Sequence, residues 1–229
     1  MTKLRATVSN QVFIGCPWKT VRPKYEKISD ALNKKFPVSF AIIGREREHR
    51  AEELLGIIKS TLEKSSKAIF DATNSNANVS LEFGYAEAKD IDSAIYFCTH
   101  GRTGAKGAAT AIISDLAGMR RKDYKNEIGL HRLLSEFCQN HPYTTRFEKL
   151  MRSKKSGTNR HKKKKFRALA LKIIHFIDNK NQVRRDDIID AITANDRYKY
   201  AEVDECIKRL HSHSLIIVSQ GRYSDVRIA

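Results

Sequence analysis

The chain has 229 residues and a formal net charge of +17, with 41% hydrophobic and 30% charged residues. This composition is typical of a folded, soluble protein and excludes a largely disordered chain. No apolar run approaches the roughly 20 residues that a membrane span requires, and the first residues lack the apolar core of a secretory signal. We therefore expect a cytoplasmic protein without a membrane partner.

Short apolar runs alternate with amphipathic segments over the first two thirds of the chain. The runs predict strands at residues 12–18, 38–44, 67–73, 93–100 and 119–124. Apolar residues at helical spacing predict helices at 22–36, 51–65, 78–90 and 126–138. This alternation is typical of an α/β domain in which helices cover both faces of a parallel sheet.

The composition changes at residue 153. Residues 153–165 are basic and have no apolar period, so we predict a linker between a first domain at 1–152 and a second at 166–229. From Arg152 onward the sequence holds 19 Lys and Arg against 9 Asp and Glu. Three amphipathic helices are predicted at 166–181, 184–192 and 200–216, followed by a hairpin. This order resembles a winged helix-turn-helix domain.

Three segments follow predicted strands at the edge where parallel sheets bind ligands, namely residues 15–18, 71–78 and 100–107. Residues 44–50 and the glycine-rich 100–107 could contact a phosphate, although an exposed charge run and a crossing loop are simpler interpretations. The eight histidines and four distant cysteines form no spacing that predicts a metal site or a disulfide.

Glu82 is an acid among apolar residues near the start of a predicted helix, with Asn76 or Asn78 as the cap. The apolar stripe of this helix leaves Glu82 and Tyr85 on the flank toward the ligand-binding edge. Glu82 could simply complement the helix dipole, a contribution of about 0.3–1 kcal/mol. Alternatively, the dipole keeps the carboxylate ionised beside a pocket, where it can attack or stabilise an oxocarbenium-like sugar carbon.

The stretch AIFDATNSNANVSLEFGYAEA and its flanking segments resemble the bacterial TIR-like proteins and the nucleoside 2-deoxyribosyltransferases, which are built on a flavodoxin-like parallel sheet. Both groups have a Pro-aromatic turn after the first strand, an Asn-rich turn before a Glu-aliphatic-Gly-Tyr-Ala helix, and a later Asp-Leu-x-Gly segment. The matching positions are Cys16, Pro17, Trp18, Asp71, Asn76, Asn78, Val79, Glu82, Gly84, Tyr85, Ala86, Asp115, Leu116 and Gly118.

The resemblance implies cleavage or transfer at an N-glycosidic bond of NAD or of a nucleoside, with Glu82 as the catalytic carboxylate. NAD or the nucleotide is then a substrate, and no cofactor is expected. Ala77 stands where the family usually has Pro, so the substrate and the choice between hydrolysis and transfer stay open. The substrate-binding residues that the resemblance implies are Cys16, Pro17, Trp18, Asp71, Asn76, Asn78, Tyr85 and Asp115.

For the second domain, the concentration of positive charge favours nucleic acid over a protein-docking role. The predicted contacts are Lys162, Lys163, Lys164, Lys165, Lys199, Tyr200, Lys208, Arg209 and Arg222. The two domains together resemble retron-associated antiphage effectors. That resemblance implies a regulated toxic enzyme whose partners are DNA or structured RNA-DNA and a reverse transcriptase or another defence protein. The oligomeric state stays open, with a homo-oligomer as one option. The rival interpretation is a nucleotide-sensing transcription regulator without catalysis.

Overall fold

The computed structural model describes residues 7–43, 51–73, 76–99, 121–153, 159–178, 180, 182–195, 198–219 and 224–229. The chain divides into two units. The first comprises Met1–Leu32 and Phe40–Phe137, and the second comprises Asn33–Ser39 and Cys138–Ala229. None of the described helices has the length and apolar content that a membrane span requires.

The first unit is an α/β domain built on a five-stranded sheet of described residues, with the strand order β2-β1-β3-β4-β5. Its strands are β1 (Val8–Gly15), β2 (Ser39–Ala41), β3 (Ser65–Asp71), β4 (Ser93–Cys98) and β5 (Arg121–Tyr124). The pairs β1–β3, β3–β4 and β4–β5 run parallel. The predicted α/β class with a parallel sheet is confirmed, and the order is consistent with a flavodoxin-like fold.

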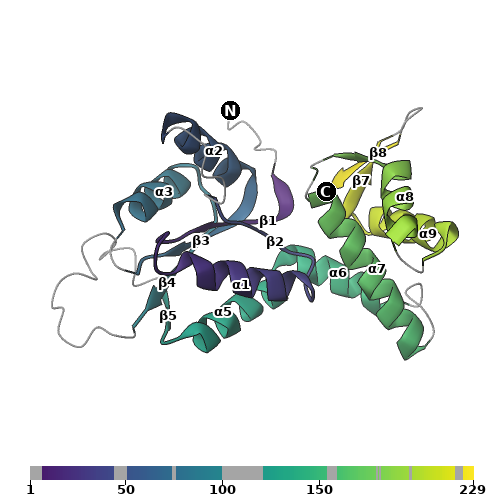
Figure 1. Ribbon diagram of the computed structural model, residues 1–229, viewed down its shortest axis with the longest axis horizontal. Coiled ribbons are helices and arrows are strands. Elements are labelled where there is room, and N and C mark those ends of the chain that lie inside the picture. The colour runs from purple at the N-terminus through teal and green to yellow at the C-terminus, as the bar shows by residue number, and fades with distance from the viewer. Residues whose placement is uncertain are drawn as a thin grey trace. The chain divides into compact units, whose positions relative to one another are not determined.

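Within the described part of the first unit, four helices cover this sheet, and both faces are used, as predicted. They are α1 (Arg22–Asn33), α2 (Ala51–Lys64), α3 (Ala77–Ala88) and α5 (Glu127–Asn140). Figure 1 shows α2 and α3 on one face of the sheet and α1 and α5 on the other. The central strands are buried almost continuously, as the four consecutive buried residues Ala68–Asp71 at the end of β3 illustrate.

An aromatic cluster fixes α3 on the sheet. The ring of Phe70 in β3 lies 5.9 Å from that of Phe13 in β1 and meets Phe83 of α3 edge to face at 5.5 Å. Val79 and Ala86 of α3 are buried in the same cluster. Because residues 79, 83 and 86 share one helical face, their burial sets the rotation of α3 about its axis. That rotation determines where Glu82 lies.

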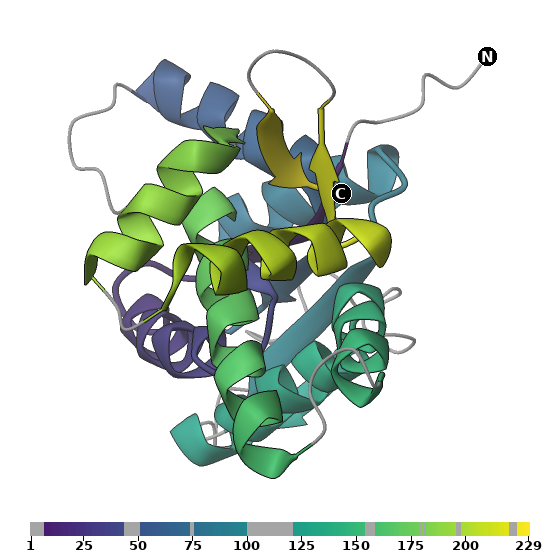
Figure 2. The same cartoon turned by 90° about the vertical axis from the view of Figure 1, so that its right-hand side faces the viewer.

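The second unit combines helices with a small antiparallel sheet. Its elements are α6 (Pro142–Arg152), α7 (Arg160–Asp178), β6 (Val183–Arg184), α8 (Arg185–Asn195), α9 (Tyr200–Ser212), β7 (Ile216–Val218) and β8 (Asp225–Ile228). The described strands pair in the order β6-β8-β7, and both pairs are antiparallel. The predicted three helices and hairpin are therefore present. Figure 2 shows α7, α8 and α9 gathered beside β7 and β8.

The chain passes from the first unit to the second between Phe137 and Cys138, whereas the sequence predicted the boundary at a linker over residues 153–165. Residues 154–158 lie outside the described part, but α7 already begins at Arg160, so the basic run is helical. Asn159 supports this start, because its side-chain oxygen accepts a 2.8 Å hydrogen bond from the Lys162 backbone N–H. In addition, α6 belongs to the second unit, where the Tyr143 hydroxyl donates to the Leu215 carbonyl at 2.6 Å.

Candidate active site

Glu82 lies in the second turn of α3. The helix begins after Asn76, whose side-chain oxygen accepts hydrogen bonds from the backbone N–H groups of Asn78 at 2.9 Å and Val79 at 3.3 Å. Asn76 is therefore the cap, and no acid stands in the first turn. The helix dipole acts mainly on charges within that first turn. The interpretation of Glu82 as a dipole-complementing acid consequently loses most of its basis.

The carboxyl group of Glu82 reaches the end of β1 and lies against Gly15. A Cβ atom placed on Gly15 would be 2.5 Å from Oε2 of Glu82 and 2.7 Å from Cδ1 of Phe70. A side chain at this strand end would therefore displace the Glu82 carboxyl group or the Phe70 ring, and glycine lets both keep their positions. The α3 rotation set by the aromatic cluster thus delivers Glu82 to the edge of the sheet where ligands are expected.

Burial raises the pKa of Glu82 from its ordinary value of 4.5 to about 7. Among the described residues, none donates a hydrogen bond to this carboxyl group or forms an ion pair with it. Its ionised form is therefore penalised by lost hydration without compensation. The expected help from the helix dipole is weak at this second-turn position, so burial determines the direction of the pKa shift. Near neutral pH both forms are populated.

A cavity of about 450 Å³ opens beside Glu82, between β1, α2 and α3. Within the described chain it is lined by Cys16, Trp18, Leu54, Leu55, Ile58, Asn76, Asn78, Val79, Leu81 and Glu82. Its walls are mainly apolar, and Glu82 is the one charged residue among them. The large apolar side chains of Trp18, Leu55 and Leu81 remain 40–64% exposed at this cavity. An apolar pocket with a few polar groups is typical of small-molecule sites.

The turn after β1 contributes two of its three predicted residues to the cavity. The Cys16 thiol is buried, and burial together with the negative charges of Asp71 and Glu82 raises its pKa, so it stays neutral. Trp18 lies at the cavity with the Arg22 guanidinium 4.8 Å from its ring centre. Pro17 has a structural role instead, because its carbonyl accepts hydrogen bonds at 3.2 Å from the backbone N–H groups of Val21 and Arg22 at the start of α1.

Asp71 is not a lining residue, although it follows the strand as predicted. Its side chain is fully buried and accepts hydrogen bonds from the hydroxyls of Tyr25 at 2.9 Å and Tyr124 at 2.6 Å. The Thr73 backbone N–H donates to its second oxygen at 2.9 Å. The two tyrosines join the end of β3 to α1 and β5, and the Thr73 bond closes the turn after the strand. The position of Asp71 thus supports a structural role at the site.

Tyr85 also lies away from the cavity lining. Its hydroxyl donates to the Glu63 carboxylate of α2, which the Lys89 ammonium contacts at 3.0 Å. These charged partners hold the tyrosine on the α2 side of α3, whereas Glu82 reaches β1. The predicted substrate residue Asp115 lies outside the described residues, as do the segments 44–50 and 100–107, for which phosphate contact was one of two interpretations.

The apolar wall supplied by α2 is a part of the site that the sequence analysis did not identify. Leu54, Leu55, Ile58 and Leu62 form one helical stripe, which predicts a core-facing surface. Leu62 is fully buried as expected, but the other three line the cavity. The sequence held one indication of this wall, since α2 directly precedes β3 in a sheet whose ligand-binding edge was already predicted.

Comparison with protein-family models gave no match, and neither did comparison with curated proteins. The described residues contain no group of His, Cys, Asp and Glu arranged to hold a metal ion. The assignment of the site therefore depends on its geometry and on the chemistry of its side chains.

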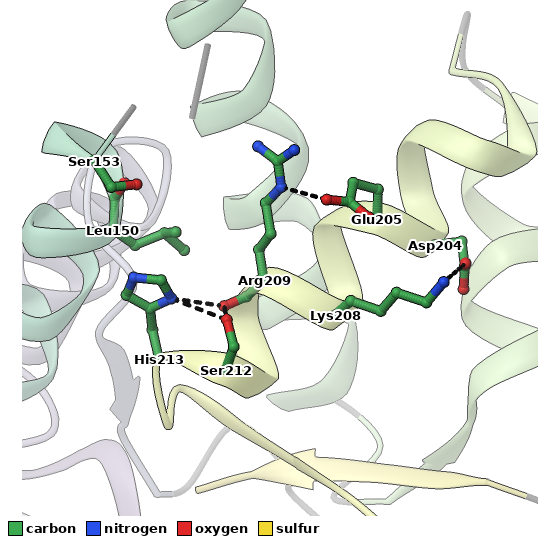
Figure 3. Close-up of polar contacts among 8 residues, drawn as sticks. All are labelled: Leu150, Ser153, Asp204, Glu205, Lys208, Arg209, Ser212 and His213. Carbon is green, nitrogen blue, oxygen red and sulfur yellow. Dashed lines mark hydrogen bonds and ion pairs between the residues drawn. The ribbon is translucent and has the colours of Figure 1, made fainter. Parts of the chain in front are cut away.

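The predicted nucleic-acid contacts of the second unit fall into two sets. Lys162, Lys163, Lys164 and Lys165 are exposed on the first turns of α7. The second set belongs to α9 and comprises the cap residue Lys199 with Tyr200, Lys208 and Arg209. The side chain of Tyr200 is 60% exposed. The Lys208 ammonium contacts the Asp204 carboxylate at 2.9 Å, and the Arg209 guanidinium contacts that of Glu205 at 2.7 Å (Figure 3). Arg222 lies outside the described residues.

Proposed function

We propose that this chain is an N-glycosidase that cleaves the base–sugar bond of NAD or of nucleosides and nucleotides, with Glu82 as its catalytic carboxylate. One observation carries the proposal: the Glu82 carboxyl group, delivered by α3 to the end of β1, is the one charged group that the described residues place at an apolar cavity of about 450 Å³. A carboxylate beside a sugar carbon is the group that glycosidic cleavage requires.

The lining suits both halves of such a substrate. Apolar side chains can cover the faces of a planar base, and the amides of Asn76 and Asn78 can bond sugar hydroxyls. The ionised Glu82 attacks the anomeric carbon, and the base departs with the electron pair of the C–N bond. Water then releases the sugar from the resulting ester, or a second base accepts it. The neutral Cys16 thiol does not compete as a nucleophile, since burial disfavours its thiolate.

We further propose that the second unit is a winged-helix domain that binds nucleic acid and controls the enzyme. Three helices, a short strand β6 between the first two of them, and a closing β7–β8 hairpin that pairs with β6 support the fold assignment. The excess of Lys and Arg from Arg152 onward supports the ligand. A nucleotide-depleting enzyme needs such control, so the composite fits a regulated toxic effector of prokaryotic antiphage defence. A reverse transcriptase or another defence protein would then be its partner, as the resemblance to retron-associated effectors implies.

The test is to incubate the full chain with NAD and a panel of nucleosides, with and without nucleic acid, and to measure base release by chromatography. Glu82→Gln should abolish release. Glu87→Gln is the matched control, because it makes the same substitution at an exposed position five residues further along α3. Base release that survives in Glu82→Gln would reject the proposed catalytic role. Tight nucleotide binding without turnover in either protein would instead favour the transcription regulator.

A further inference from the structure

The basic residues of the second unit are divided unequally between α7 and α9. Helix α7 carries seven Lys and Arg against one Asp, whereas α9 carries three acids against two Lys and Arg. In a helix-turn-helix protein the helix placed like α9 would be expected to enter the DNA groove. Its charge does not suit that role, because an acidic excess repels phosphates.

The two basic residues of α9 are already neutralised by acids of the same helix. Figure 3 shows the Lys208 side chain directed at Asp204 and the Arg209 side chain directed at Glu205. Asp204 also pairs with Arg185. A phosphate that approached α9 would have to break these pairs while meeting their carboxylates. The net attraction at α9 is therefore small.

The first turns of α7 present the opposite situation. We call residues 160–165 the α7 arm. All six are exposed, and the buried residues of α7 begin only at Leu169. Lys165 pairs with Glu202 at 2.6 Å. The side chains of Arg160, Lys162, Lys163 and Lys164 make no ion pair within the described chain, so their charges are uncompensated.

The uncompensated charges also match the charge density of a nucleic acid. Residues 160–164 span about 6 Å along the helix axis at 1.5 Å per residue. The three that share one face, Arg160, Lys163 and Lys164, correspond to about one cation per 2 Å, close to the one phosphate per ~1.7 Å of axis that duplex DNA presents. An acidic protein surface seldom reaches this density. Arg160, Lys163 and Lys164 follow i, i+3, i+4 spacing and therefore share one face of the arm.

We propose that the backbone of a nucleic acid binds the α7 arm of this protein, through Arg160, Lys163 and Lys164, and does not bind α9. This inference rests on the proposed nucleic-acid binding of the second unit and relocates its interface. Ammonium and guanidinium groups contact phosphates irrespective of sequence, so binding should depend strongly on salt and little on sequence.

The test compares three variants of the full chain with the wild type, using a 25-base-pair DNA duplex titrated over a range of salt concentrations. The arm variant carries Arg160→Ala, Lys163→Ala and Lys164→Ala. The α9 variant carries Lys208→Ala and Arg209→Ala. A charge-matched control carries Lys34→Ala, Lys64→Ala and Lys125→Ala, three exposed lysines outside the arm and α9. Circular dichroism verifies folding, and alanine favours the helical state of the arm.

We expect the arm variant to bind at least about tenfold more weakly near 0.1 M salt, with a slope of log K against log salt reduced by about 3. The control and the α9 variant should stay within a fewfold of the wild type. Weakening confined to the α9 variant would overturn the inference and leave nucleic-acid binding intact. If the wild type bound polyglutamate as tightly as it binds the DNA duplex, the inference would be overturned in favour of an acidic protein as the partner. Absence of any DNA binding by wild type would reject nucleic-acid binding itself, whereas base release tests the enzyme independently.

Discussion

Gly15 and Glu82 occupy complementary positions, since a single methyl group at Gly15 would lie 2.5 Å from the Glu82 carboxyl oxygen Oε2. The first residue ends β1 and the second lies in α3, so the site is formed by two segments that are distant in the sequence. Phe70 packs beside both segments, because its ring would also contact a methyl group at Gly15 and meets the Phe83 ring of α3 edge to face. The carboxyl group is therefore held by steric fit rather than by hydrogen bonds from described residues.

Gly15→Ala should impair catalysis more than folding. The added methyl group must displace the Glu82 carboxyl group or the Phe70 ring, and a shift of about 1 Å in a reacting group can cost about 100-fold in rate. Overpacking should cost about 1–3 kcal/mol of unfolding free energy. Base-release kinetics and urea unfolding measure the two effects.

Gly84→Ala is the matched control for this substitution. Gly84 lies in α3 next but one to Glu82, and a Cβ there would meet nothing within 4 Å. Alanine in a helix interior should stabilise the protein by about 0.5–1 kcal/mol with turnover unchanged. Equal turnover of Gly15→Ala and wild type would contradict the proposed position of the carboxyl group.

The pH dependence of turnover should report the titration of Glu82. The reaction needs the ionised form, and burial raises the pKa of this group to about 7. We expect kcat/KM for a neutral nucleoside to rise about tenfold per pH unit below pH 7 and to level off above it. The Cys16 thiol stays protonated throughout, because burial and nearby carboxylates raise its pKa. A flat profile between pH 5 and 8 would show that Glu82 ionisation does not limit the reaction.

Glu82→Gln should stabilise the fold in a pH-dependent way. The pKa of Glu82 is about 7 in the folded chain against an ordinary 4.5, so the folded state holds the proton more tightly than the unfolded state. The penalty for ionisation is absent below about pH 4.5, grows as the pH rises, and is complete above about pH 7. It amounts to about 3 kcal/mol for a shift of this size.

Urea unfolding at pH 5 and pH 8 measures this effect through the fluorescence of Trp18, the single tryptophan of the chain. Glu82→Gln should exceed wild type in stability clearly at pH 8 and only slightly at pH 5. Glu87→Gln is exposed and should show no such difference between the two conditions. If Glu82→Gln instead destabilised the protein more at pH 8 than at pH 5, its carboxylate would have a stabilising partner.

The strands, the ligand edge and the position of Glu82 near that edge were predictable because they depend on local periodicity and on a general rule for parallel sheets. The walls of the site were not predictable in this way. Whether a helical stripe such as Leu54, Leu55 and Ile58 meets the core or a cavity is decided by packing between distant segments. Likewise, the basic run before Phe166 has no apolar period, yet the cap at Asn159 and the burial that begins at Leu169 make it the start of a helix.

Asp71 shows the same limit for a polar residue. Its place at the end of a strand predicts a ligand contact, but its hydroxyl donors lie 46 and 53 residues away in the sequence. No local pattern indicates that two tyrosines will enclose it. The structure thus separates two acids at one edge of the sheet: Asp71 is fully bonded within the protein, and Glu82 faces the cavity.

Tyr124→Phe should therefore lower stability without weakening substrate binding. The substitution removes the 2.6 Å hydrogen bond to the Asp71 carboxylate and keeps the ring, and a bond to a charged acceptor contributes about 1.5–3 kcal/mol. Tyr25→Phe should cost a similar amount. The double variant should depart from the sum of the two, because both hydroxyls share Oδ2 of Asp71.

Tyr200→Phe is the control for this series, since its ring is 60% exposed and its hydroxyl makes no hydrogen bond within the described chain. It should change the unfolding free energy by less than about 0.5 kcal/mol. Unfolding in urea gives the stabilities, and KM for the best substrate gives the binding readout. An increased KM at unchanged stability in Tyr124→Phe would return Asp71 to the substrate-binding residues. Lower stability at unchanged KM would confirm that Asp71 supports the edge of the sheet from within and does not bind the substrate.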